Sequence, residues 1–191
     1  MTDTATVSGE KRARRPVRRR WLRRVLIAAV AVVVAFAACT ARLIVWPPQG
    51  IPARVDAIVV LAGPGTRLPV GVQLASEGHA PVLVVSQGHL GYGGSCPAPI
   101  TGVRIICFDP NPADTRGEAE YTEKLAKRYG WHSIAVVATS EQATRAQLIV
   151  GRCFNGSVYV VTGSMPWQQV PYQIAYGWAA LVKALVLQRS C

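Results

Sequence analysis

From residue 55 onward, short continuous apolar runs alternate with stretches in which apolar residues recur at helical spacing. Continuous apolar runs bounded by turn residues are typical of strands buried on both faces of a parallel sheet. We therefore predict five strands, which are residues 56–62, 80–86, 103–108, 133–139 and 157–162. We predict helices at residues 67–78, from residue 114 or 115 through a basic last turn at residues 124–128, at 141–154 and at 167–189, the last interrupted near Pro171.

This alternation of strands and helices predicts a doubly wound α/β domain with a mainly parallel, five-stranded sheet covered by helices on both faces. The domain spans residues 55–191 and follows a linker at residues 47–54. The apolar fraction of 50% over 191 residues excludes a disordered protein. In sheets of this kind ligands bind outside the carboxyl ends of the strands, so residues that follow the strands are the first candidates for a site.

A different pattern precedes the domain, where residues 25–41 contain no charged residue. As a helix this segment is about 25 Å long, close to the ~30 Å hydrocarbon core of a bilayer, and apolar residues up to Trp46 extend it. Trp21 and Trp46 fall where interfacial aromatic side chains are expected, and Pro47 ends the helix. We predict a single-pass transmembrane signal anchor at residues 25–46.

The distribution of charge along the chain predicts the orientation of this anchor and argues against binding to nucleic acid. The formal net charge is +11, but nine of the 21 basic residues lie among residues 1–24. The positive-inside rule therefore predicts a cytoplasmic tail at residues 1–24, next to anionic lipid, and a domain outside the plasma membrane. The rest of the chain is only mildly basic, so we do not expect it to bind nucleic acid.

Two other interpretations of the apolar segment stay open. Small residues at Ala35, Ala37 and Ala38 are compatible with the cleavage point of a secretory signal. Residues 36–39 resemble a lipobox in which Cys39 is the lipidated residue, although phenylalanine fits poorly at its first position. A buried core helix would not explain the arginine-rich flank.

The cysteines agree with export. Four of them, Cys96, Cys107, Cys153 and Cys191, lie beyond the anchor, and none has the spacing of a zinc site. We predict the disulfides Cys96–Cys107, which closes a short loop, and Cys153–Cys191, which ties down the last helix. The alternative is four free, buried thiols, as in cytosolic proteins. The sequence predicts neither a metal nor a cofactor.

Candidate ligand-binding residues follow the predicted strands. Gly63, Gly65 and Arg67 combine a flexible backbone with a cation at a helix start, which suits an anion such as phosphate. The alternative is a Gly/Pro turn with a solvated arginine. The later strands are followed by Ser86, Gln87, Gly88, Thr115, Glu118, Thr139, Ser140, Gln142 and Arg145. We expect Arg67 and Arg145 to converge on one anionic ligand.

Several of these residues also have ordinary structural roles. Glu118 is the carboxylate best placed for acid–base chemistry, although an acidic residue in the first turn of a helix also stabilises the helix dipole. Thr115 and Ser140 are candidate helix caps. The sequence thus leaves a catalytic and a structural role open for the same residues.

The histidines and known motifs add little. The chain has no Walker A loop and no GxSxG elbow. His79 and His132 precede strands in turns, where we expect them to be solvated. His89 follows a strand, but its spacing pairs it with no nucleophile.

Four segments, taken in order, resemble the YdcF-like family, which includes SanA- and ElyC-like envelope proteins. They are residues 56–63 with Arg67, Ala75 and Gly78, residues 84–88, residues 114–119 and residues 138–146. The third segment matches a Thr-x-x-Asn/Glu-Ala helix start, and the fourth matches a Thr-Ser-x-x-His-x-x-Arg-Ala pattern. The resemblance covers about residues 55–165. Gln142 stands where the family usually has a histidine, and Gln87 where it usually has a glycine.

The resemblance implies a Rossmann-like α/β fold and a role in envelope integrity, in peptidoglycan or lipid-carrier metabolism. We therefore expect an extracytoplasmic domain that binds a small phosphate-bearing or lipid-linked precursor, with Glu118 and Gln142 as candidate catalytic residues. Because glutamine cannot shuttle a proton at neutral pH, a non-catalytic binding or scaffold module is the alternative. A binder of nucleotides or S-adenosylmethionine is a third, because one relative is reported to bind S-adenosylmethionine.

Overall fold

The computed structural model describes residues 15–88, 95–164 and 167–191, which form two compact units, residues 1–39 and 40–191. The first unit holds the helix α1 (Arg15–Thr40), which continues into a π-helical turn, η1 (Ala41–Val45). The stretch Arg19–Val45 is long and apolar enough to cross a membrane, and an 18-residue segment within it has a mean hydropathy of 2.3. The helix begins ahead of the expected anchor at residues 25–46 because its basic flank is helical too, and it ends before Pro47 as expected.

The second unit contains the predicted five-stranded parallel sheet, with strand order β3-β2-β1-β4-β5. Its strands are β1 (Ala57–Val60), β2 (Val82–Ser86), β3 (Arg104–Phe108), β4 (Ser133–Thr139) and β5 (Ser157–Gly163). All four residues of β1 and six of the seven residues of β4 are buried. The continuous apolar runs therefore do correspond to strands covered on both faces, and the doubly wound fold is confirmed.

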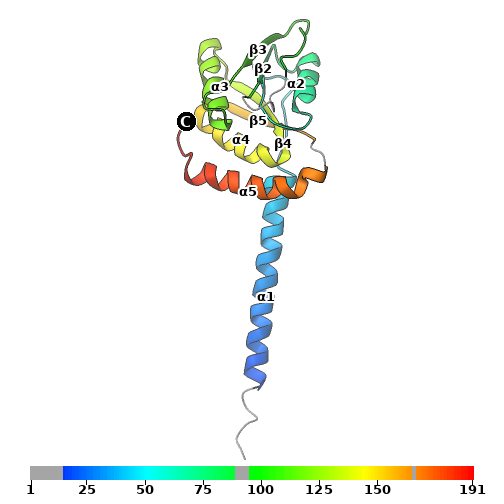
Figure 1. Ribbon diagram of the computed structural model, residues 1–191, viewed down its shortest axis with the longest axis vertical. Coiled ribbons are helices and arrows are strands. Elements are labelled where there is room, and N and C mark those ends of the chain that lie inside the picture. The colour runs from blue at the N-terminus through cyan, green and yellow to red at the C-terminus, as the bar shows by residue number, and fades with distance from the viewer. Residues whose placement is uncertain (1–14, 89–94, 165–166) are drawn as a thin grey trace, which may run out of the picture. The chain divides into compact units, whose positions relative to one another are not determined.

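Successive side chains of the central strands pack alternately into two hydrophobic cores, one on each face of the sheet. Ile58 and Val60 of β1 pack in the core under α2 (Arg67–Ser76). Val59 packs on the opposite face, with residues of α3 (Thr115–Tyr129) and α4 (Ser140–Cys153). Figure 1 shows α2 and α3 on opposite sides of the sheet. This two-sided cover leaves the carboxyl edge of the sheet as the place where α2, α3 and α4 begin.

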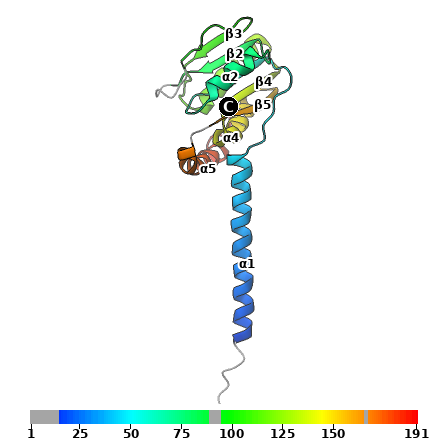
Figure 2. The same ribbon diagram turned by 90° about the vertical axis from the view of Figure 1, so that its right-hand side faces the viewer.

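The last helix, α5 (Val170–Val186), follows a 3-10 turn at Trp167–Gln169 and packs on α4 rather than on the sheet. Figures 1 and 2 both show α4 between the sheet and α5. We expected a helix over residues 167–189 with a break near Pro171. That prediction is wrong in detail, because Pro171 lies in the first turn of α5, where a proline leaves no hydrogen bond unmade.

Both predicted disulfides are present in the second unit. Cys96 is bonded to Cys107 of β3, and Cys153 at the end of α4 is bonded to Cys191. Cys39 is a free, exposed cysteine. The alternative of four free thiols is therefore wrong, and the second bond fixes the C-terminus to α4.

Two expected helix caps are wrong. Asp114, not Thr115, caps α3, because its Oδ1 accepts hydrogen bonds from the N–H groups of Arg116 (2.9 Å) and Gly117 (3.0 Å). Thr139 occupies the cap position of α4, and Ser140 is already helical. The Thr139 hydroxyl donates to the Glu141 carboxylate instead of receiving a backbone N–H. Thr115 and Ser140 are thus both first residues of their helices.

Candidate functional site

The carboxyl edge of the sheet holds a group of buried polar side chains. We define the polar cluster as five of them, each at most 7% exposed: Arg67, Ser86, Thr115, Glu118 and Gln142. They come from α2, β2, α3 and α4, which all begin or end at this edge. Buried charged and polar groups are rare unless they are paired, so their partners determine what the cluster can do.

Arg67 is held mainly by protein groups. Its Nε donates to the carbonyl of Pro64 (3.1 Å), and its Nη1 donates to the carbonyl of Ala62 and to Oε1 of Gln142. Burial and, to a smaller extent, nearby Arg145 lower the pKa of Arg67 to about 10, whereas Glu118 and Glu141 favour the charged form. Arg67 is therefore a cation at neutral pH that spends most of its donors on the fold.

The glycines after β1 are closely surrounded by protein atoms. A Cβ on Gly63 would lie 1.8 Å from Nη2 of Arg67, so a side chain here would displace the guanidinium. A Cβ on Gly65 would lie 2.6 Å from the Ser164 carbonyl oxygen and 3.0 Å from Cγ2 of Thr139. Protein atoms therefore fill the space that a side chain would need at either position, and the expectation that both glycines admit an anion stays a prediction.

Glu118 is the buried carboxyl of the cluster and is 3% exposed. Its Oε1 accepts a hydrogen bond of 2.6 Å from the N–H of Ala62. Burial raises the pKa of Glu118 to about 7, although the Ala62 N–H, Ser86, Arg67 and Arg145 all favour the charged form. The Ser86 hydroxyl lies close enough to act on this carboxyl but outside hydrogen-bonding geometry. A carboxyl with a pKa near neutrality can take up or release a proton at physiological pH.

Gln142 connects Arg67 to α3. Its Oε1 accepts from Arg67, and its Nε2 lies 3.3 Å from the Thr115 hydroxyl oxygen, to which it donates. Its carbonyl oxygen and its amide group are therefore both engaged by the protein. This explains why the Thr115 side chain turns toward α4 instead of capping α3.

Arg145, one turn further along α4, is the cation of this region that faces outward. Its guanidinium lies 5.7 Å from the centre of the Tyr176 ring, and its Nε is buried without a hydrogen-bond partner among the described residues. Its charge affects the pKa of both Arg67 and Glu118, so it lies close to the polar cluster. Arg145 lies close enough to Arg67 to lower its pKa, and their convergence on one anionic ligand stays a prediction. The Nε of Arg67 donates to Pro64, whereas that of Arg145 has no hydrogen-bond partner among the described residues.

Arg145 lines a partly open pocket of about 250 Å³ between α3, α4 and α5. The lining residues are Asp114, Thr115, Arg145, Tyr176, Ala179, Ala180, Lys183 and Gln188. Both oxygens of Asp114 are occupied, because Oδ1 caps α3 and Oδ2 accepts from Nε2 of Gln188 at 3.2 Å. The pocket therefore presents the cations Arg145 and Lys183, together with the Thr115 hydroxyl, to a ligand.

The α5 residues of this pocket were missed from the sequence. Tyr176, Ala180 and Lys183 are spaced by four and three residues, so they share one face of a helix. That spacing is the available signal, but it does not reveal that α5 lies over α4.

The other predicted residues lie apart from the polar cluster. The N–H of Gln87 bonds to the Phe108 carbonyl at 2.9 Å, and Gly88 has a φ of 62°. Thr139 lies beside Gly65, and Ser140 is half-buried. None of these side chains makes a hydrogen bond to the cluster within the described part of the chain.

His79 and His132 do not contribute to this edge. His89 lies outside the described residues. His79 precedes β2 and its Nδ1 lies 3.1 Å from the Ala53 carbonyl oxygen, while His132 is exposed and its N–H donates to Asp56. Hydrogen bonds from the N–H groups of His132 and Ser133 lower the pKa of Asp56, although burial alone would raise it. These groups fix the amino ends of β1 and β4. In the ranges that the structure describes, no three His, Cys, Asp or Glu side chains gather to hold a metal.

No protein-family model matches the chain, and no curated protein matches it. The resemblance to the YdcF-like family therefore rests on the four sequence segments alone. The pocket and the polar cluster are the structural features that bear on function.

Proposed function

We propose that this protein is anchored in the plasma membrane and that its domain, outside the cytoplasm, binds a phosphate-bearing envelope precursor or lipid carrier. The observation that carries the proposal is Arg145, which lines the pocket and whose Nε is buried without a hydrogen-bond partner among the described residues. An unpaired buried donor is unfavourable, and an anionic ligand would satisfy it. The resemblance to the YdcF-like family points to the same class of ligand.

The chemistry of the pocket favours phosphate over a neutral ligand. Arg145 supplies a planar cation and Lys183 a mobile one, and the carboxylate of Asp114 is occupied by other groups. The Tyr176 ring holds the Arg145 guanidinium in place by a cation–π contact. Guanidinium and ammonium groups together are a common means of binding phosphate in proteins.

Arg67 has a different role in this proposal from the one the sequence suggested. Because its Nε and Nη1 donate to Pro64, Ala62 and Gln142, it positions the cluster and stabilises charge behind the pocket. Arg145 and Lys183 hold the anion. Thr115 is shared, since its hydroxyl meets Gln142 and also lines the pocket.

Whether the bound ligand reacts depends on Glu118 and Gln142. Glu118, with a pKa near 7, is the candidate proton acceptor or donor. Gln142 favours the second candidate function, a non-catalytic binding module, because both of its polar groups hold neighbouring residues and it cannot carry a proton. A Gln142→His variant distinguishes the two: a gain of turnover on a bound phosphate ester supports an enzyme, and unchanged binding without turnover supports the binding module.

The two disulfides support a domain outside the cytoplasm, because such bonds persist in oxidising compartments. The basic residues that flank the apolar helix support a cytoplasmic N-terminus by the positive-inside rule.

Thermal unfolding of the full-length protein in detergent tests the proposal. A polyprenyl phosphate, a peptidoglycan precursor and S-adenosylmethionine are added separately, each near 100 times its dissociation constant, where binding stabilises by about 2.7 kcal/mol. We expect a rise in melting temperature with the polyprenyl phosphate or the precursor, lost in Arg145→Gln and kept in Lys124→Gln, an exposed cation on α3. A shift that both variants retain, or none with any phosphate, would contradict the proposal.

A further inference from the structure

The helix α5 is apolar around almost its whole circumference. Among its 17 residues Lys183 is the only charged one. One face buries Gly177, Ala180, Leu181 and Ala184 against the rest of the unit. The opposite face is also apolar and is exposed among the residues that the structure describes. Surface helices normally carry polar residues on that face, and a helix without them is buried in a core or in a membrane.

The exposed apolar side chains of the second unit are concentrated on this helix. Apart from Tyr129 and Trp46, every large hydrophobic residue that the described part of this unit exposes belongs to α5 or directly follows it. We call these residues the α5 face: Val170, Tyr172, Tyr176, Val182, Leu185, Val186 and Leu187. Isolated exposed hydrophobics need no explanation, but a contiguous set on one helix marks an interaction surface.

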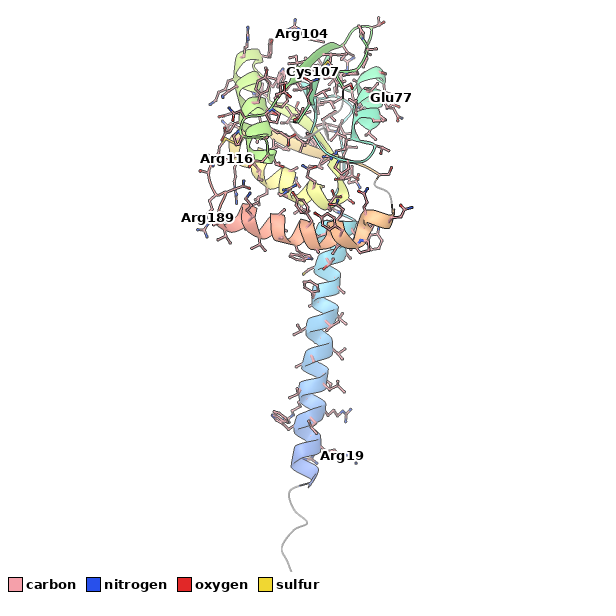
Figure 3. The ribbon with its side chains drawn as sticks, in the orientation of Figure 1. Arg19, Glu77, Arg104, Cys107, Arg116 and Arg189 are labelled. Atoms are coloured by element: carbon pink, nitrogen blue, oxygen red, sulfur yellow. A yellow bond between two sulfur atoms is a disulfide. The ribbon has the colours of Figure 1, made fainter. Side chains whose placement is uncertain are left out.

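The charged surface lies elsewhere. Figure 3 shows Arg104 and Glu77 at the end of the unit that is remote from α5. The acidic and basic residues of α3, which is polar on its exposed side, include the ion pairs Arg116–Glu120 and Lys127–Glu123. The unit is therefore polarised, with one apolar helix and an otherwise ordinary charged surface.

The position of α5 in the fold indicates which partner covers its exposed face. The membrane-spanning stretch runs to Val45, and its last residues, from Thr40 on, belong to the second unit. Ile44 is buried there and lies 3.3 Å from where a Cβ on Gly177 would be. Trp178 Nε1 donates to the Thr40 hydroxyl at 3.1 Å. The last turn of the apolar stretch, which belongs to the second unit, thus packs beside α5.

Three attachments make α5 a fixed part of the unit rather than a loose tail. Its small residues pack closely on α4, with the Glu141 carbonyl oxygen 3.4 Å from a Cβ built on Gly177. Arg152 of α4 donates hydrogen bonds to the carbonyls of Ala184 and Gln188, which lie at the C-terminal end of α5 and just beyond it. The Cys153–Cys191 disulfide closes the same end. The α5 face is consequently held in one orientation within the second unit.

We propose that the α5 face docks on the lipid bilayer in which the N-terminal segment is anchored, so that α5 lies in the interface parallel to the membrane. Val182, Leu185 and Val186 enter the boundary between headgroups and acyl chains. Tyr172, Tyr176 and Trp46 are exposed aromatic residues of the kind that occupies this depth. Arg189, which is exposed just beyond α5, meets anionic headgroups. Because the domain is tethered to the membrane, the bilayer is present at a high effective concentration. This favours the bilayer over a second copy of the chain as the partner of the α5 face.

Site-directed spin labelling of the full-length protein in phosphatidylglycerol–phosphatidylethanolamine vesicles tests this docking. A nitroxide is placed at Val182→Cys in a Cys39→Ala background, and its depth is measured from its accessibility to oxygen and to a water-soluble nickel chelate. The matched control is Tyr129→Cys, which labels the exposed hydrophobic residue outside the α5 face. We expect the Val182 label about 5–10 Å below the headgroup boundary and the Tyr129 label in water.

Two results would overturn the inference. A Val182 label as accessible to the nickel chelate as the Tyr129 label would show that the α5 face stays in water. A label hidden from both reagents, with spin–spin broadening between molecules, would assign the face to a second copy of the chain. A Leu185→Glu variant should move the Val182 label outward without lowering the melting temperature. None of these measurements depends on what the pocket binds, so their failure is distinct from failure of the proposed function.

Discussion

Nη1 of Arg67 donates a hydrogen bond to Oε1 of Gln142, and this bond joins α2 to α4 across the carboxyl edge of the sheet. Replacing Gln142 by leucine removes it and the bond to Thr115, and leaves a buried cation short of an acceptor. We expect a loss of about 1–3 kcal/mol in the free energy of unfolding, because buried polar groups without partners keep their desolvation penalty.

The control for this variant is Gln73→Leu on α2, where the exposed glutamine bonds only to Glu77. We expect a change within about 0.5 kcal/mol there. Urea unfolding of both variants provides the comparison. Equal losses of unfolding free energy in the two variants would show that the hydrogen bond between Arg67 and Gln142 does not stabilise the fold more than an exposed one does.

The fit of Arg67 against Gly63 gives a second prediction. Gly63→Ala places a methyl group 1.8 Å from Nη2 of Arg67, at a φ of 132° that alanine rarely adopts. The variant should lose both stability and phosphate binding, because the guanidinium must leave its hydrogen bonds. Gly78→Ala separates the two causes, since Gly78 also has a positive φ, 83°, but nothing lies within 4 Å of its Cβ position. Melting temperatures should fall further for Gly63→Ala, and an equal fall would assign the effect to backbone strain alone.

Glu118 predicts a pH dependence of stability. Burial raises its pKa in the folded state from 4.5 to about 7, so the folded protein binds the proton more tightly than the unfolded chain does. The stabilisation is therefore complete below pH 4.5 and is lost as the pH rises to about 7. A shift of this size corresponds to about 3 kcal/mol.

Glu118→Gln supplies the reference for that measurement, because its neutral amide resembles the protonated acid. The unfolding free energy of the wild type minus that of the variant should decrease between pH 4.5 and pH 7. Other titrating groups, including Asp56, cancel in this difference. A difference that is constant with pH would mean that Glu118 is not the titrating group.

The disulfides predict one free thiol in the unreduced, denatured protein, that of Cys39. Five thiols would refute the oxidised state. Removing the Cys153–Cys191 bond should cost about 4 kcal/mol and removing Cys96–Cys107 about 3 kcal/mol, because the longer loop gains more entropy in the unfolded chain. The loops span 38 and 11 residues. Double alanine variants of each pair, compared by urea unfolding, should follow that order.

The fold could be predicted from the sequence because each strand is a continuous apolar run. Residues 133–139, for example, are β4. The sequence predicted β1 to extend to residue 62, but it ends at Val60. The reason is tertiary: the N–H of Ala62 bonds to Glu118 and its carbonyl to Arg67, which takes the backbone out of the ladder. No local pattern could have revealed those partners.

The site could be predicted only in part, for a similar reason. The rule that ligands bind at the carboxyl edge of the sheet found Arg67, Glu118 and Gln142. It gave no indication that Arg67 would donate to the carbonyl of Pro64 in the preceding loop. Nor did it indicate that Tyr176 and Lys183 of α5 would line the pocket beside α4. Packing of helix on helix decides these contacts, and helical spacing alone does not specify which helix is the neighbour.

The most direct test of the central claim is an equilibrium titration of the full-length protein in nanodiscs with a polyprenyl phosphate and with the polyprenyl alcohol of equal chain length. We expect the phosphate to bind at least about tenfold more tightly, a difference of roughly 1.4 kcal/mol, and Arg145→Gln to abolish that difference. Equal affinities for the phosphate and the alcohol, or a preference for phosphate that Arg145→Gln leaves unchanged, would contradict the assignment of the pocket as a phosphate site.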